Sequence, residues 1–327
     1  MGRLANTILL LLALATSGAA GERVVVGAYV NDITALDLRT HSWSADVYVW
    51  FRWKDPETDP EKDPTIDPAT TVGFVNAFEL WGHTRTTDQE KPRFFPETGE
   101  RYQVVRQQGR FSTKFDLTAY PFDRQVLTIE LEEQALELDA VEFVPDEEPI
   151  VVNPQLLLPG FVLGQARLVV EPYEYPTGFG EPGHRRARFS RVRIEIPIQR
   201  PALTHGVKFL LPILCVVACA AMLFFFDPKF VESRAEFGIT SLLTIVALQI
   251  TLNEDLPEID YLVLIDKLYL AAYFFVIASL GVVVRSSWLI NRGEDQRAIR
   301  IDRRSLLALG LLFLLAVVGL IVTALRG

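Results

Sequence analysis

Apolar and polar residues alternate along much of the first half of the chain, whereas long apolar runs fill the second half. The alternation is clearest over residues 47–53, where successive side chains of an extended strand would face opposite sides. Stretches rich in Pro and Gly, notably 55–67 and 175–183, separate such segments. Many short strands between turn signals predict a β-sandwich. The other strand-like segments are 24–30, 101–105, 126–131, 166–170 and 189–196.

The apolar runs of the second half are long enough, or nearly so, to cross a bilayer, which takes roughly 20 residues. The connection between the second and third runs is acidic and has no basic residue, while arginines crowd the connection between the third and fourth. The positive-inside rule therefore predicts that the arginine-rich connection lies in the cytoplasm. The predicted spans are residues 207–226, 237–252, 261–284 and 306–325.

The first 20 residues have the layout of a secretory signal peptide, with Arg3 before a short apolar run and small residues after it. An uncleaved anchor is the alternative. We predict a signal peptide at 1–20, an extracellular domain at 21–202 and a transmembrane domain at 203–327. An exported N-terminus and four crossings put both ends of the mature chain outside the cell. The cysteines, Cys215 and Cys219, both fall in the first span, so the exported domain has no structural disulfide.

The second span carries an unusual stripe. Steps of four, three, four, three and four residues connect Glu236 to Glu254 along one side of a helix, and Glu232 extends the stripe by a turn. Charges at membrane depth usually face a water-filled path. One helix cannot enclose water but several copies around an axis can, so the stripe predicts a symmetric oligomer with a central pore. Its residues are Glu232, Glu236, Thr240, Leu243, Ala247, Ile250 and Glu254.

Several motifs then occur in order along the chain. They are Trp53-Lys54-Asp55, Tyr120-Pro121-Phe122-Asp123-Arg124-Gln125, Leu211-Pro212 and Leu256-Pro257. Together they resemble the Cys-loop receptors, the family of pentameric ligand-gated ion channels. In eukaryotic members cysteines bracket the second motif. Thr113 and Leu127 stand there in this chain, and its cytoplasmic loop is short, so the resemblance is to the bacterial members.

The resemblance implies an α+β membrane protein. Its extracellular immunoglobulin-like β-sandwich would stand on a four-helix transmembrane bundle, and the chain would assemble as a homopentamer in the bacterial inner membrane. Agonists of this family bind between neighbouring sandwiches, in a cage of aromatic residues. By position, the ligand-binding residues are Tyr48, Trp81, Glu132, Tyr173, Tyr175, Phe179 and Phe189. The usual Trp-x-Pro appears here as Phe74-Val75-Asn76, and Gln134 replaces the aromatic residue of the second binding loop.

Five copies of Glu236 and Glu232 would form acidic rings, which attract cations and repel anions. Thr240 would offer hydroxyl groups to a partly dehydrated ion, and Glu254 would concentrate cations above the pore. The middle of the stripe, Leu243, Ala247 and Ile250, would close by dewetting. The sequence thus predicts a channel for monovalent cations.

A link between the two halves is needed for gating. By resemblance, Asp37, Asp123 and Arg200 would form an electrostatic cluster over the connection that contains Pro257. A movement of the extracellular domain would push there and tilt the pore helices.

Other functions fit less well. An anion-selective channel of the same family and a non-conducting membrane-anchored receptor stay open, whereas a transporter would call for repeated halves with broken helices. The histidines are scattered and no Gly-rich phosphate loop occurs, so we expect neither an enzyme, nor a cofactor or metal site, nor a nucleic-acid partner. The expected partners are other copies of the chain, membrane lipid and permeant cations. The agonist stays open among an amine, protons or hydroxide, and a divalent cation.

Overall fold

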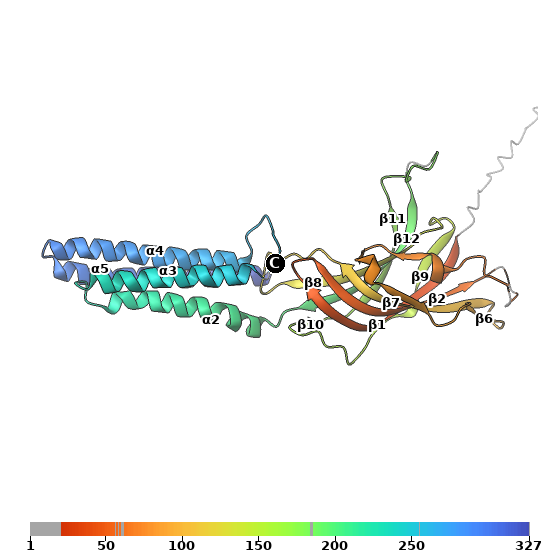
Figure 1. Cartoon of the computed structure of the whole chain (residues 1–327), viewed down its shortest axis with the longest axis horizontal. Coiled ribbons are helices and arrows are strands. Elements are labelled where there is room, and N and C mark those ends of the chain that lie inside the picture. The colour runs from red at the N-terminus through yellow and green to blue at the C-terminus, as the bar shows by residue number, and fades with distance from the viewer. Residues whose placement is uncertain are drawn as a thin grey trace, which may run out of the picture.

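The computed structural model is elongated, with strands at one end and helices at the other (Figure 1). It describes residues 21–326 except 56, 58, 60, 61, 184, 185 and 255. The predicted signal peptide at 1–20 lies outside the described residues. Within them, the last strand ends at Gln199 and the first long helix begins at Ala202. This confirms the prediction of a β-rich N-terminal half followed by apolar helices.

The strands described in the N-terminal half form two sheets. The order in one is β4-β7-β2-β1-β9, with β5 and β6 also paired to β7; the order in the other is β10-β12-β8-β3, with β11 paired to β12. The first sheet comprises β1 (Glu22–Asp37), β2 (Ser42–Lys54), β4 (Ala77–Phe78), β5 (Thr84–Thr87), β6 (Arg93–Phe95), β7 (Glu100–Ser112) and β9 (Val141–Val152). The second comprises β3 (Val72–Phe74), β8 (Arg124–Glu133), β10 (Val162–Leu163), β11 (Arg167–Glu174) and β12 (Arg188–Gln199). Short helices, α1 (Pro68–Thr71) and η1 (Leu80–Gly82), lie between β2 and β5.

Strand β2 has the alternation that the sequence predicts. Val47, Val49, Phe51 and Trp53 are each no more than 1% exposed, while the residues between them are half-buried. Burying an apolar side chain of this size contributes about 1.5–3 kcal/mol. The strand is therefore fixed in register by the face that it turns inward.

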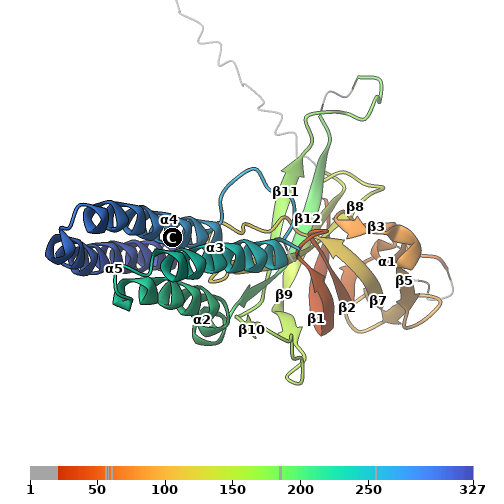
Figure 2. The ribbon, with the colours of Figure 1, turned by 60° about the vertical axis from the view of Figure 1, so that its left-hand side comes forward.

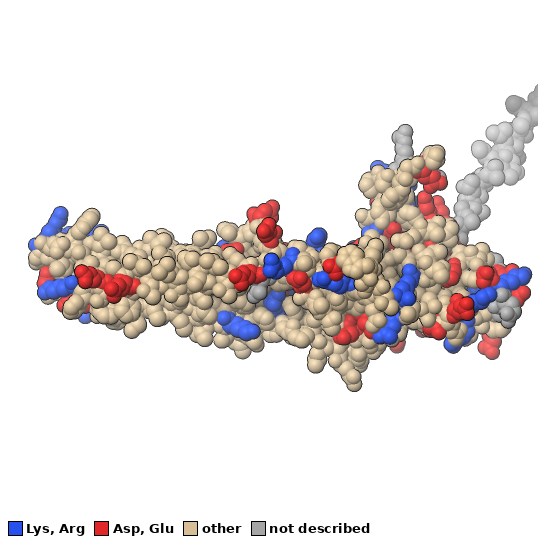
Figure 3. Space-filling model, in the orientation of Figure 1, with Lys and Arg blue, Asp and Glu red and all other residues tan. Residues whose placement is uncertain are grey.

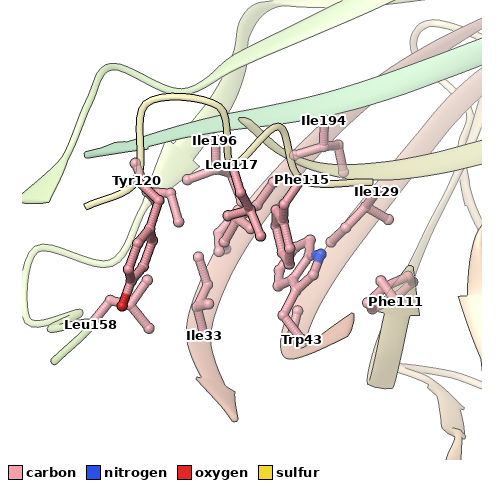
Figure 4. Close-up of a cluster of buried hydrophobic side chains, with 14 of the residues drawn as sticks. Ile33, Trp43, Phe111, Phe115, Leu117, Tyr120, Ile129, Leu158, Ile194 and Ile196 are labelled. Atoms are coloured by element: carbon pink, nitrogen blue, oxygen red, sulfur yellow. The ribbon is translucent and has the colours of Figure 1, made fainter. Parts of the chain in front are cut away.

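Side chains of both sheets meet in one buried hydrophobic cluster (Figure 4). Trp43 and Phe111 come from the first sheet, and Ile129 and Ile194 come from the second. Phe115 enters the same cluster from the loop that follows β7. This loop, residues 113–123, is thus held by the core of the β-rich half.

Helices follow from Ala202 onward, and in the described residues four of them are long and apolar enough to cross a membrane. They are α2 (Ala202–Ala221), which continues as the 3₁₀ turn η2 (Met222–Phe225), α3 (Val231–Asn253), α4 (Leu264–Asn291) and α5 (Asp295–Arg326). The face in Figure 3 shows few charged side chains along the middle of this half, and charges at its two ends. These features support a membrane protein.

The helix limits differ from the predicted spans, chiefly at charged ends. Helix α3 begins at Val231 rather than at 237, and α5 begins at Asp295 rather than at 306, because charged residues continue a helix beyond its apolar part. Helix α4 begins at Leu264 rather than at 261, and residues 261–263 belong to the connection before it. Regular α-helix in α2 covers Ala202–Ala221, against the predicted span 207–226.

The helices run back and forth between the two ends of their half (Figures 1 and 2). The connection between α3 and α4 lies beside the strands, and the C-terminal end of α5 returns to the same place. The turn between α4 and α5 lies at the far end. Helix α4 packs against the other three helices.

Candidate functional site

The predicted pore stripe lies on one exposed side of α3. Leu243 is 65% exposed and Ile250 is 58% exposed, in the same range as large apolar residues such as Phe274 of α4 and Leu315 of α5. The other members are also exposed: Glu232, Glu236, Thr240, Ala247 and Glu254. All seven side chains are therefore left unpacked by the single chain.

The buried side of α3 holds the helix against its own bundle. Ile245 is fully buried, and Gly238 brings the backbone so close to α4 that an added Cβ would lie 2.3 Å from Leu280 Cδ2. Any side chain at this position would therefore force Leu280 to move. The residues buried along α3 are Arg234, Gly238, Ser241, Ile245 and Leu252. The rotation of the helix is thus fixed with the stripe turned away from the bundle.

Arg234, which lies between the two acidic residues of the stripe in sequence, is fully buried on that other side. Its guanidinium lies 2.8 Å from the Asp302 carboxylate of α5, and its Nε donates a hydrogen bond of 2.9 Å to the carbonyl of Leu223. Ser286 of α4 also donates to Asp302. This cluster connects the N-terminal end of α3 to three neighbouring elements. Asp302 was not predicted as the partner of Arg234.

Four of the predicted ligand-binding aromatics come together on the hairpin of β11 and β12, which projects from the β-rich half (Figures 1 and 2). The ring of Tyr175 lies at the centre of the group. Its centroid is 4.8 Å from that of Tyr173, 5.0 Å from that of Phe179 and 6.0 Å from that of Phe189, and each pair meets edge to face. Such pairs are a favoured aromatic geometry. We call Tyr173, Tyr175, Phe179 and Phe189 the aromatic cluster.

Glu132 of β8, another of the predicted ligand-binding residues, borders the aromatic cluster. The Tyr175 hydroxyl donates a hydrogen bond of 3.0 Å to its carboxylate. Arg191 of β12 is a further member that the sequence did not reveal. Its guanidinium stands 3.4 Å from the centroid of the Tyr173 ring and 5.6 Å from that of Tyr175, and its Nη2 lies 2.8 Å from a Glu132 oxygen.

The ionisation of this group follows from its contacts. Burial lowers the pKa of Arg191, but the hydrogen bond and the charge of Glu132 outweigh burial, so the pKa is raised above its ordinary value. Burial, together with the bond to Glu132, raises the pKa of Tyr175. The group therefore holds a charged guanidinium and a neutral phenol at neutral pH.

The remaining predicted ligand-binding residues, Tyr48 and Trp81, lie elsewhere. The ring centroid of Tyr48, on β2 of the other sheet, is 6.2 Å from that of Tyr29, and the Arg106 guanidinium stands 5.1 Å from it. Trp81 on η1 is 86% exposed. A single chain therefore does not assemble the whole predicted cage.

Two of the predicted gating residues form a buried ion pair. Arg200 Nε lies 3.0 Å from an Asp123 oxygen, with side chains 10% and 1% exposed respectively. The guanidinium also stands 4.5 Å from the Phe161 ring centroid and 5.1 Å from that of Tyr120. Gln125 donates a hydrogen bond of 2.9 Å to the second oxygen of Asp123. Arg200 directly follows β12, and Asp123 is the last residue of loop 113–123. The ion pair therefore fixes the loop to the end of β12 at the junction with the helices.

Loop 113–123 also contacts the helices directly. The amide of Leu117 donates to the Tyr261 hydroxyl at 3.1 Å, and the amide of Leu264 donates to the Thr118 carbonyl at 3.0 Å. Beside these contacts is a cavity of about 660 Å³, lined by this loop, the end of β12 and parts of α4 and α5. The loop is thus hydrogen-bonded both to Tyr261 in the connection before α4 and to Leu264, the first residue of α4.

Asp37 and Pro257 take different places. The Asp37 carboxylate accepts hydrogen bonds from the backbone amides of Arg39 and Thr40 after β1. Burial opposes ionisation there, but these bonds and that of the Thr40 side chain leave the pKa of Asp37 below its ordinary value. Pro257 is half-buried in the connection before α4. The hydrogen bonds described for Asp37 stay within its own turn, and none of them reaches the Asp123–Arg200 pair.

Replacing Arg200 with Gln is expected to lower the free energy of unfolding by about 3–5 kcal/mol, because Asp123 would stay buried without its counter-ion. Thermal unfolding of the purified protein, followed by tryptophan fluorescence, measures the change. Arg124→Gln removes an exposed arginine from the start of β8 and is expected to change stability by about 0.5 kcal/mol or less. Equal effects of the two substitutions would contradict a role for the pair in holding the junction.

Among the residues that the structure describes, no group of three or more His, Cys, Asp and Glu side chains could hold a metal ion. A comparison with protein-family models finds no match for this sequence.

Proposed function

We propose that this chain is one subunit of a cation-selective, ligand-gated ion channel, with α3 lining the pore. The observation that carries this proposal is the exposed stripe of α3. It is acidic at both ends, bears a hydroxyl near Glu236 and is apolar in the middle. On a lipid-facing helix the acidic ends of this stripe would be destabilising, because charged groups at membrane depth are costly unless they face water.

The assembly is proposed as a homopentamer. The two sheets would form an immunoglobulin-like sandwich, and five helical bundles would surround a pore with α3 innermost. One subunit would supply the aromatic cluster and its neighbour would supply Tyr48. That arrangement agrees with the separation of Tyr48 from the cluster in the single chain, and with the resemblance to the Cys-loop receptors.

Ion selection would occur at the end of α3 that is far from the strands. Rings of Glu232 and Glu236 would concentrate cations there and exclude anions. The ions would then pass Thr240 and the apolar section around Leu243, which would stay dry and non-conducting in the closed state. Glu254 would raise the local concentration of cations at the opposite mouth.

The proposed orientation places the strands outside the cell and the turn between α4 and α5 in the cytoplasm of a bacterium. Arginines gather at that end of the helices, as the positive-inside rule requires. They are Arg285, Arg292, Arg297, Arg300, Arg303 and Arg304.

Gating would use the contacts at the junction. A ligand or a change of pH acting on the strands would shift loop 113–123, and the loop would pass the movement to Tyr261 and Leu264. The Asp123–Arg200 pair would keep the loop and the end of β12 moving as one unit.

Voltage clamp of the purified protein in lipid, under a sodium chloride gradient and with stepped bath pH, tests the proposal. We expect currents that reverse near the sodium equilibrium potential. Reversal near the chloride potential would make the chain an anion channel and would overturn the role given to the glutamates. Absence of current at every pH and with every small amine tried would favour a non-conducting receptor.

A further inference from the structure

The aromatic cluster already contains a cation. Arg191 places its guanidinium 3.4 Å from the centroid of the Tyr173 ring and is itself only 6% exposed. A cation within about 6 Å of a ring centroid is attracted by the negative face of the ring. The position that an organic ammonium ion would take on Tyr173 is thus filled by the chain itself.

The polar partners of such a ligand are taken as well. Arg191 Nε and Nη2 both contact Glu132, at 2.9 and 2.8 Å, and Nη2 donates to the Tyr175 hydroxyl at 2.7 Å. Nη1 lies 3.4 Å from a Glu130 oxygen. Arg191 carries one positive charge, and Glu130 and Glu132 carry one negative charge each. An added ammonium ion would therefore have to displace the guanidinium from its carboxylates, at a high cost in free energy.

We propose that Arg191 is a built-in cation that determines the ligand specificity of the aromatic cluster. In the wild-type protein it excludes organic ammonium ions from this position, and its removal converts the cluster into a site that binds them. The inference rests on the proposed function only in taking the cluster as the ligand site of the channel. It narrows the class of agonist, since an amine seated on Tyr173 is excluded.

The test compares wild type with the double variant Arg191→Ala/Glu130→Gln. This pair of changes vacates the guanidinium position and leaves the local charge at minus one, carried by the buried Glu132, which is then open to an added cation. The probes are methylguanidinium, which replaces the lost group, and tetramethylammonium, a simple organic cation. Saturation-transfer NMR on their methyl protons measures binding to the full-length protein in detergent, at constant ionic strength.

Arg193→Gln is the matched control. Arg193 is two residues along the same strand and pairs with Glu171 and Glu195, so its loss removes one arginine and leaves the cluster filled. Any probe bound in the pore would contribute equally to the saturation-transfer signal of wild type, Arg191→Ala/Glu130→Gln and Arg193→Gln. The single variant Arg191→Gln, measured in parallel, provides a second vacated cluster.

We expect the double variant to bind both probes at least about tenfold more tightly than wild type or Arg193→Gln, as cation–π contact and a carboxylate in a dry site allow. Tetramethylammonium binding to wild type with the affinity of the variant would overturn the exclusion. If Arg191→Ala/Glu130→Gln and Arg191→Gln both fold but neither binds either probe, the aromatic cluster is not a cation-binding position and the proposal is overturned. Because no current is measured, these results do not depend on whether the protein conducts.

Discussion

Replacing Glu232 and Glu236 together with Gln is expected to move the reversal potential at least halfway from the cation potential toward zero. Gln keeps the size of Glu and removes its charge. An ideal cation channel in a tenfold sodium chloride gradient would reverse at about 59 mV. Voltage clamp of the reconstituted double variant in the same gradient measures the change.

The size of the effect follows from electrostatics. A cation about 4 Å from one carboxylate gains about 1 kcal/mol even at the dielectric constant of water. A chloride ion at that place loses a similar amount, and about 1.4 kcal/mol corresponds to a tenfold preference. A ring of several carboxylates therefore suffices for strong selection, although salt screens part of it.

Glu294→Gln provides the control for this substitution. Glu294 lies at the same end of the helices, in the turn before α5, and its carboxylate is 2.8 Å from Arg297 rather than on the exposed stripe. We expect its loss to leave the reversal potential unchanged. A double variant of Glu232 and Glu236 with wild-type selectivity would remove these residues from the selectivity filter.

Local patterns in the sequence predicted the elements that depend on local physics. The alternation in residues 47–53 predicted β2, because a strand with one buried face must alternate. The steps of three and four from Glu236 to Glu254 predicted that these residues share one side of α3, and all of them are exposed in the single chain. Both predictions needed only the geometry of one element.

Features that depend on distant parts of the chain were not predicted. Strand β9 pairs in parallel with β1, with Glu22 opposite Val141, and no local pattern reveals which strands will pair. The register of β12 on β8 sets Arg191 opposite Glu132, and that register is unknown from sequence. The sign in the sequence that Arg191 belongs to the aromatic cluster was its position two residues after Phe189.

The start of α5 shows why charged segments are hard to assign. Residues 295–305 contain four arginines and two aspartates, and a hydropathy pattern assigns such a stretch to a loop. They are helical here, and Asp302 among them faces inward to Arg234. No local pattern distinguishes Asp302 from Asp295 or marks it as a buried partner.

Substituting Arg234 with Met is expected to lower the free energy of unfolding by about 3–5 kcal/mol, because the buried Asp302 would lose its counter-ion. The Arg234 side chain is fully buried and that of Asp302 is 3% exposed. Without the guanidinium, the Asp302 carboxylate keeps only the Ser286 hydroxyl as a described hydrogen-bond donor from a side chain. The midpoint of thermal unfolding, measured by size-exclusion chromatography of heated samples, reports the loss.

The double variant Arg234→Met/Asp302→Leu separates loss of the pair from the cost of an unpaired charge. Replacing both partners by apolar residues is expected to restore most of the stability, since a buried pair is often no better than apolar packing. Arg297→Met, which removes an arginine with a side chain that is 60% exposed, should cost about 1 kcal/mol or less. A single variant as stable as wild type would contradict the role of the pair.

The same variants test whether the pair orients the acidic rings. Two residues along a helix turn through about 200°, so Arg234 points away from both Glu232 and Glu236. Holding Arg234 against Asp302 therefore turns the two glutamates out of the bundle. If the apolar double variant regains stability but loses part of its cation preference, the pair sets the rotation of α3. Unchanged selectivity in that variant would assign the rotation to Gly238 and Ile245 alone.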